Sequence, residues 1–178
     1  MPPVSRLGRQ IAEATSALTA IDAPFALIGG LALAFHKVVR ATQDVDLLVD
    51  ADKADAIDAR LLALGYRCLH RSEDAGNYVR GHERLDLLYA RRPIARLLLS
   101  EAKPLDTAFG RLRVIGAEGL IGFKLQALVN DPSRTQDRED IQSLLRANRA
   151  SLDMDRVREY FRIFDRESLL DELLQGTR

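Results

Sequence analysis

The sequence predicts a mixed α/β (α+β) protein, in which a β-sheet core flanked by helices is followed by a helical C-terminal part. Short apolar runs of strand character alternate with helical periodicity through the first 115 residues. Glycine or proline separates most of these runs, and from residue 117 onward only helical periodicity remains. We therefore expect residues 1–115 to form an α/β core with an N-terminal helix, and residues 116–178 to form a helical region packed on that core.

Periodicity and turn residues predict the elements of the core one by one. Apolar residues at every third or fourth position indicate helices, and short apolar runs bounded by turn residues indicate strands. The predicted elements are, in chain order, a helix at 7–21, a strand at 25–28, a short helix at 31–37, a strand at 44–49, a helix at 52–64, a strand at 66–71, a hairpin at 77–80 and 84–89, a helix at 93–100, and one or two strands within 103–115. The hairpin loop is predicted to be Gly81-His82-Glu83, and Gly110 is predicted to lie at a turn.

The C-terminal part is predicted to be helical throughout. Its predicted helices are 117–130, 135–148, 153–163 and 166–175. The arginines of this part alternate with nearly equal numbers of acids, which is more typical of salt-bridged helix faces than of an RNA-binding patch.

Composition excludes several classes of function. Lys+Arg and Asp+Glu both total 26, so no global electrostatic field indicates nucleic acid or a membrane as a partner. The chain has one cysteine, no N-terminal signal region and no apolar run of membrane-spanning length, which predicts a cytoplasmic protein. Charge is uneven locally, because residues 41–59 hold six acids against one lysine and residues 60–113 hold eleven basic residues against six acids. Two such blocks could bind metal ions and phosphates, or could be two solvated faces.

Asp44-Val45-Asp46 is the first candidate site, because it places two acids at the start of an apolar strand. Side chains alternate along a strand, so the two carboxylates share a face and lie roughly 7 Å apart. A divalent cation would remove their repulsion, since Mg²⁺ prefers carboxylate oxygens. The alternative is that Asp44 precedes the strand in solvent and Asp46 pairs with an arginine.

Two further features accompany the acid pair. Gly29-Gly30 ends a predicted strand before a predicted helix, where free backbone N–H groups could approach a phosphate. Asp86 is a lone acid inside a later apolar strand, and a neighbouring strand could bring it to the same metal ion. Each feature alone has an ordinary explanation, but their order along the chain points to one site.

Lys124 lies within an apolar helical stripe that also contains Ile121, Leu125 and Leu128. An unpaired ammonium would be costly there, so Lys124 needs an anion as a partner. That anion could be a structural carboxylate, which Asp137 or Asp140 on the next helix could supply, or it could be the phosphates of a substrate.

The order of Gly29-Gly30, Asp44-Val45-Asp46 and Asp86 resembles the signature of the nucleotidyltransferase superfamily that includes DNA polymerase beta. The segment from Glu118 to Lys124, continued by 134–141, is similar to the Lys…Asp-x-x-Asp-Ile motif of the AbiEii-like branch, which comprises abortive-infection and toxin–antitoxin nucleotidyltransferases. The resemblance runs from about residue 25 to residue 145 and implies a mixed β-sheet of the nucleotidyltransferase type.

The resemblance also implies an activity and a metal site. The expected reaction moves a nucleoside monophosphate from a nucleoside triphosphate to a hydroxyl acceptor. Asp44 and Asp46 would hold two Mg²⁺ ions, with Mn²⁺ as the alternative, and Asp86 would help to hold one ion or act as the base.

Other residues would bind the nucleotide. Gly29 and Gly30 would contact the β- and γ-phosphates through their backbones, and Lys124 would offset phosphate charge, with Asp137 beside it in the active site. Arg40 and Thr42 could contact phosphate, although capping of the strand is the simpler explanation for both.

The expected partners are a nucleoside triphosphate, an acceptor that is tRNA, a protein or a small molecule, and, for a toxin component, an antitoxin protein. A different class of function is a non-catalytic nucleotide-binding or partner-binding module on the same fold. A third is a helical interaction protein in which every acid is structural.

Overall fold

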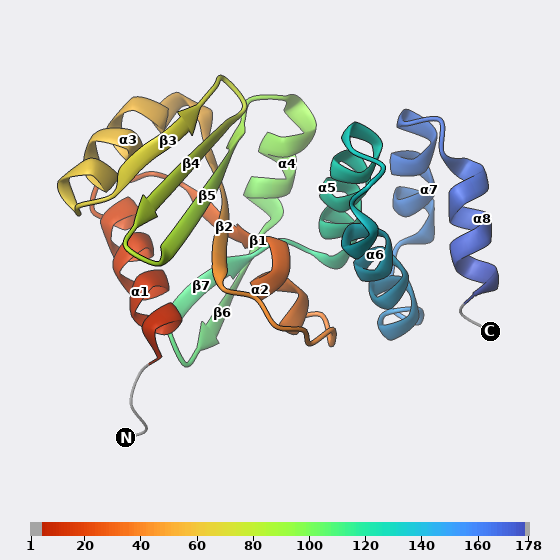
Figure 1. Cartoon of the computed structure of the whole chain (residues 1–178). Coiled ribbons are helices and arrows are strands. Elements are labelled where there is room, and N and C mark those ends of the chain that lie inside the picture. Colours follow the sequence, from red (N-terminus) through yellow and green to blue (C-terminus); the bar gives the residue numbers. More distant parts are fainter. Residues whose placement is uncertain (1–4, 177–178) are drawn as a thin grey trace. The chain divides into compact units, whose positions relative to one another are not determined.

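The computed structural model describes residues 5–176, which form one mixed sheet of seven strands and eight α-helices (Figure 1). The predicted fold class is therefore confirmed. The elements in chain order are α1 (Arg6–Thr19), β1 (Phe25–Ile28), α2 (Gly29–Ala34), β2 (Asp44–Asp50), the 3₁₀ helix η1 (Ala51–Lys53), α3 (Ala54–Ala63), β3 (Arg67–Arg71), β4 (Ala75–Arg80), β5 (Glu83–Ala90), α4 (Pro93–Glu101), β6 (Lys103–Thr107), β7 (Gly110–Val114), α5 (Ala117–Asn130), α6 (Thr135–Ala147), α7 (Met154–Ile163) and α8 (Glu167–Gln175).

The chain divides into two compact units. The sheet unit consists of the residues up to 31 together with 41–115, and the helical unit consists of 32–40 together with the residues from 116 onward. Helix α2 crosses this division, because its first three residues belong to the sheet unit and its last three to the helical unit.

The sheet has the strand order β3-β4-β5-β2-β1-β7-β6. Its centre is mixed, since β2 pairs antiparallel with β1 and parallel with β5. Val45, Leu47 and Val49 of β2 are buried, as the alternation of side chains along a strand requires for a face in the core. Helix α3 covers this face, because the Tyr78 hydroxyl on β4 donates a hydrogen bond to Asp58 on α3. The candidate acids lie on the opposite face.

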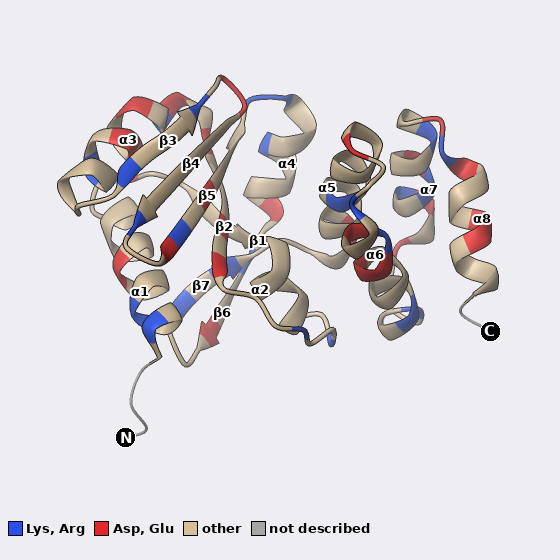
Figure 2. Cartoon of the chain, viewed as in Figure 1, with Lys and Arg blue, Asp and Glu red and all other residues tan. Residues whose placement is uncertain are grey.

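The helical unit has its own apolar core. Helix α5 packs against α6 and α7, and α8 packs against α6 and α7. Leu144 of α6 and Phe161 of α7 are fully buried in this core. Acidic and basic residues are interspersed along the exposed sides of α6, α7 and α8 (Figure 2). None of the helices in the described part of the chain combines the length and the hydropathy needed to span a bilayer.

The structure corrects the predicted hairpin. Residue Glu83 is the first residue of β5 and pairs with Arg80, so the loop contains only Gly81 and His82 instead of three residues. Gly81 has φ +58°, a left-handed conformation that suits a two-residue hairpin turn. The predicted helix at 31–37 is also corrected, since α2 already begins at Gly29 and ends at Ala34.

Candidate active site

The three candidate acids lie on one face of adjacent strands. Asp44 and Asp46 alternate with buried Val45 on β2, and Asp86 occupies the register position beside Asp46 on β5. Adjacent strands are about 4.8 Å apart, so Asp46 and Asp86 are direct neighbours across the two strands. The predicted association of the three acids on one face is what this register produces.

Gly29 is packed directly against Asp46. Strand β1 ends with Ile28 paired to Asp46, and the chain then turns into α2 with Gly29 at φ +65°. A Cβ atom on Gly29 would lie 2.1 Å from Oδ2, 2.5 Å from Cγ and 2.7 Å from Cβ of Asp46. Glycine is therefore required at this position for two reasons: the backbone conformation is left-handed, and the Asp46 carboxylate occupies the space of a Cβ atom.

Asn77 is a member of the site that the sequence did not predict. It lies opposite Asp86 on β4, and its side-chain nitrogen donates a 2.7 Å hydrogen bond to Oδ1 of Asp86. The predicted three-residue loop would have placed residue 77 opposite Leu87, so the register error concealed Asn77. The signal that could have found it is the Gly81-His82 pair itself, because two-residue loops with glycine are the commonest hairpin turns.

The acids match Mg²⁺ in chemical type but do not converge on one point. Carboxylate oxygens are the ligands that Mg²⁺ prefers, and the register brings three of them to one face. Across residues 5–176, however, no three His, Cys, Asp or Glu side chains are grouped closely enough to hold an ion as they stand. The backbone thus suits a metal site, and rotation of the acid side chains would have to complete it.

Lys124 and Asp137 lie together in the helical unit. The Lys124 ammonium is 3.0 Å from Oδ1 of Asp137 and 2.6 Å from Oδ2 of Asp140, and all three side chains are buried. Arg40 donates to Asp140 at 3.0 Å, and Arg134 donates to Asp137 at 2.5 Å. Of the two anions considered for Lys124, the structural carboxylates are therefore present.

The ion network determines the charge of Asp137. Burial raises the pKa of this carboxyl, but hydrogen bonds from Arg134 and Lys124 outweigh burial and hold the pKa below its ordinary value. The Lys124 ammonium has three N–H donors, and two are engaged by Asp137 and Asp140. One donor thus has no partner in the part of the chain that the structure describes.

The remaining predicted residues are less informative. Gly30 is buried in the first turn of α2, and Thr42 is half-buried in the segment before β2. Arg40, considered as a phosphate ligand or strand cap, forms an ion pair with Asp140. The structure thus gathers Asp44, Asp46, Asp86 and Gly29 in the sheet unit, and Lys124 with Asp137 in the helical unit.

The sheet and its flanking helices define a fold of the nucleotidyltransferase type, and comparison with solved structures supports this assignment. The chain superposes on the antibiotic-resistance factor ANT(2'')-Ia with a TM-score of 0.67 and 18% identity, over 96% of this chain and 97% of that one. For the lincosamide antibiotic adenylyltransferase LnuA, the TM-score is 0.57 and the identity is 15%, over 79% of this chain and 96% of that one. For a nucleotidyltransferase-like protein from Paracoccidioides brasiliensis, the TM-score is 0.56 and the identity is 16%, over 95% of this chain and 92% of that one. No family model and no curated protein matches the sequence.

Proposed function

We propose that this protein is a Mg²⁺-dependent nucleotidyltransferase that moves a nucleoside monophosphate from a nucleoside triphosphate to a hydroxyl group. The observation that carries the proposal is the position of Asp46 beside Asp86, with Gly29 packed against Asp46. Two carboxylates placed side by side repel each other unless a cation lies nearby. A divalent cation would relieve this repulsion.

Asp44, Asp46 and Asp86 are the residues proposed to hold the metal, with two ions expected and Mn²⁺ as the alternative to Mg²⁺. When bound, the metal lowers the pKa of the attacking hydroxyl and offsets charge on the phosphates. In the reaction, the hydroxyl oxygen forms a bond to the α-phosphorus, the bond from that phosphorus to its bridging oxygen breaks, and pyrophosphate leaves. If Asp86 does not bind metal, it is the residue proposed to accept the hydroxyl proton.

The remaining residues are assigned to the nucleotide. The backbones of Gly29 and Gly30 are proposed to approach the phosphates, and Thr42 is a further candidate contact. For Lys124 we propose that the third N–H donor of its ammonium meets a phosphate oxygen while Asp137 and Asp140 retain the other two. In this role Asp137 keeps the ammonium in place.

The acceptor that we propose is a hydroxyl of a small molecule. This choice is supported by the solved structures of similar fold, which include a complex of ANT(2'')-Ia with adenylyl-2''-tobramycin (TM-score 0.66, 19% identity) and LnuA bound to lincomycin. A tRNA or protein acceptor, and a toxin role of the AbiEii-like kind with an antitoxin partner, are the other possibilities that the sequence raises.

The test is a labelling assay with the purified chain, Mg²⁺ and each α-³²P-labelled nucleoside triphosphate. Tobramycin, lincomycin, total tRNA and a cell protein extract serve as separate acceptors. We expect label on a small molecule, abolished in Asp46→Asn and retained in Asp106→Asn, an exposed acid of β6 that serves as a control. Label on tRNA or protein alone would replace the proposed acceptor and retain the activity.

The second candidate function is a non-catalytic nucleotide-binding module. The observation that favours it is the engagement of Lys124 by two buried carboxylates, which would be present without any substrate. Binding of Mg²⁺ and nucleotide with no label on any acceptor would support this alternative. Absence of both binding and transfer would contradict both functions.

A further inference from the structure

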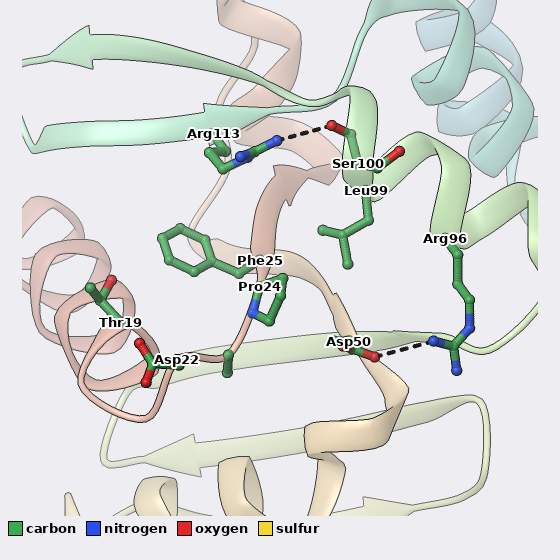
Figure 3. Close-up of a pocket in the computed structure, with 10 residues that line it drawn as sticks. Thr19, Asp22, Pro24, Phe25, Asp50, Arg96, Leu99, Ser100 and Arg113 are labelled. Atoms are coloured by element: carbon green, nitrogen blue, oxygen red, sulfur yellow. Dashed lines mark hydrogen bonds and ion pairs between the residues drawn. The ribbon is translucent and has the colours of Figure 1, made fainter.

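A cavity lies within the sheet unit, on a different part of the sheet from the candidate acids. It has a volume of about 610 Å³, which is in the range of small-molecule pockets. Phe25, Pro24 and Leu99 form its apolar floor, as Figure 3 shows. Charged side chains surround this floor, so the cavity combines the apolar area and the polar groups that ligand sites share.

Arg113 is the group in this cavity that is best prepared to bind an anion. Its Nη2 donates to the backbone carbonyls of Ser100 and Ala102 at 3.1 and 2.8 Å, which holds the guanidinium in place at the end of α4. This contact caps the helix, but it uses only two of the five N–H donors. Among the described residues Arg113 forms no ion pair with an acid, so its Nε and Nη1 donors are available to a ligand.

The other charged residues of the cavity are Arg96 and Asp50, which pair with acids or bases nearby, and Asp22, which is exposed. Arg96 is paired with Asp52 at 2.9 Å and lies 3.6 Å from Asp50, so its charge is already balanced. The hydrogen bonds that Arg96 donates to Asp52 raise its pKa, and the charges of Asp52 and Asp50 raise it as well. Asp22 is exposed on the turn after α1, and in Figure 3 it lies on the opposite side of the Phe25 ring from Arg113.

We propose that this cavity binds a small amphiphilic carboxylate, with its anionic group on Arg113 and its apolar or aromatic body on Phe25, Pro24 and Leu99. An anion is favoured over a cation because Arg113 is held in place by two backbone carbonyls. The exposed Asp22 side chain has no comparable contact in the described structure. An already immobilised donor loses little conformational entropy on binding.

The cavity is separate from the proposed nucleotide site. Phe25 begins β1 and Asp50 ends β2, whereas Gly29 follows β1 and Asp46 lies near the start of β2. Four residues along a strand correspond to about 13 Å, so the two sites lie at opposite ends of the same strand pair. The carboxylate is therefore expected to bind without competing with a nucleotide.

The experiment uses ¹⁹F NMR of the full chain with 4-fluorobenzoate, 4-fluorobenzyl alcohol and 4-fluorobenzylamine as anionic, neutral and cationic probes. We expect 4-fluorobenzoate to bind with a Kd of about 1 mM or tighter, as a ligand of this size allows. Arg113→Gln should weaken this binding roughly tenfold, because it removes the charge that the carboxylate needs. Arg111→Gln, on the same strand two residues away, is the matched control and should bind as the unmodified chain does.

A second measurement guards against a folding defect in the variant. Amide shifts of the unmodified chain should move at Phe25 and Arg113 on addition of 4-fluorobenzoate, and Mg²⁺ with ATP should not displace the probe. Equal binding of all three probes would indicate simple apolar adsorption and would overturn the proposal. Unchanged binding in Arg113→Gln, or no binding of 4-fluorobenzoate at 10-fold above the expected Kd, would overturn it as well.

Discussion

At the scale of single residues, the contact between Gly29 and Asp46 leaves no space for any side chain at position 29. Gly29→Ala should cost at least about 3 kcal/mol of unfolding free energy, because it adds left-handed strain and forces Asp46 to move. Gly81→Ala is the matched control, since Gly81 has φ +58° with nothing within 4 Å of an added Cβ. It should cost only about 1 kcal/mol. Urea denaturation of both variants measures the difference, and equal costs would show that the contact with Asp46 is unimportant.

Asp46 is proposed to bind the metal, so Asp46→Asn should remove the response of the protein to Mg²⁺. Added Mg²⁺ should raise the Tm of the unmodified chain but not that of the variant. Thermal unfolding with and without Mg²⁺ measures the difference. An identical Mg²⁺ response in the two proteins would exclude Asp46 as a ligand.

Asn77 should act by orienting Asp86. Asn77→Ala removes the donor to Oδ1 of Asp86 and leaves that carboxylate free to rotate. We expect the Mg²⁺ concentration for half-maximal thermal stabilisation to rise roughly 10-fold, in line with the effect of groups that orient metal ligands. Asn77→Gln keeps an amide and should recover part of the response. A loss of stability with no change in Mg²⁺ response would make Asn77 a structural residue only.

At the scale of elements, the buried ion network holds α5 and α6 together. Asp137→Asn leaves Lys124 and Arg134 without one of their partners, and we expect a loss of about 3 kcal/mol. Glu172→Gln, in the exposed pair with Arg138, is the control and should cost less than about 1 kcal/mol. Chemical denaturation monitored by circular dichroism distinguishes the two. Similar small losses would mean that burial adds nothing to the network.

The same network predicts a dependence on acid pH. The pKa of Asp137 is lower in the folded chain than its ordinary value of 3.8, so folding favours the ionised carboxyl. Its contribution to stability is complete above that ordinary value and is lost as the pH falls through the lower folded pKa. Unfolding curves between pH 6 and pH 2 should therefore show a shallower acid loss in Asp137→Asn. Parallel curves would show that other carboxyls dominate acid unfolding.

Element boundaries were largely predictable because local patterns determine them. Gly65 follows the end of α3, Pro93 begins α4, and the helical period of Lys124 lies inside α5. Each of these signals can be recognised from a few consecutive residues. The register between β4 and β5 was not predictable in the same way, since it depends on a loop that differs by one residue. That single residue decided whether Asn77 or its neighbour Tyr78 would face Asp86.

The candidate site was predictable only in part for a related reason. Asp44, Asp46 and Asp86 could be found as acids in apolar strands, and Lys124 as a charge in an apolar stripe. The close approach of Gly29 to the Asp46 carboxylate, which leaves no space for a Cβ atom, could not be found. It depends on how the chain turns after β1. Structural carboxylates were one of the two kinds of partner considered for Lys124. The ion pair between Arg40 and Asp140 could not be found, because it depends on packing between segments far apart in the sequence.

At the scale of the whole molecule, the balance of charge bears on the acceptor. With 26 basic and 26 acidic residues, the chain has no excess of cations to neutralise a polynucleotide backbone. We expect tRNA to bind with a Kd of about 100 µM or weaker at 0.15 M salt, which is at or beyond the weak end of non-specific binding. Fluorescence anisotropy of labelled tRNA between 50 and 200 mM KCl measures this. Micromolar binding that weakens steeply with salt would instead favour tRNA as the acceptor.

The strand order has a consequence for the order in which the protein can be assembled during synthesis. The two strands that carry the candidate acids, β2 and β5, and strand β1 before Gly29 are complete once residue 90 has left the ribosome. The other neighbour of β1 is β7, which begins only at Gly110. One edge of β1 therefore stays open while about twenty further residues are translated, and an open apolar edge invites pairing with other chains. Slow translation or truncation between these points should make the nascent protein prone to aggregate.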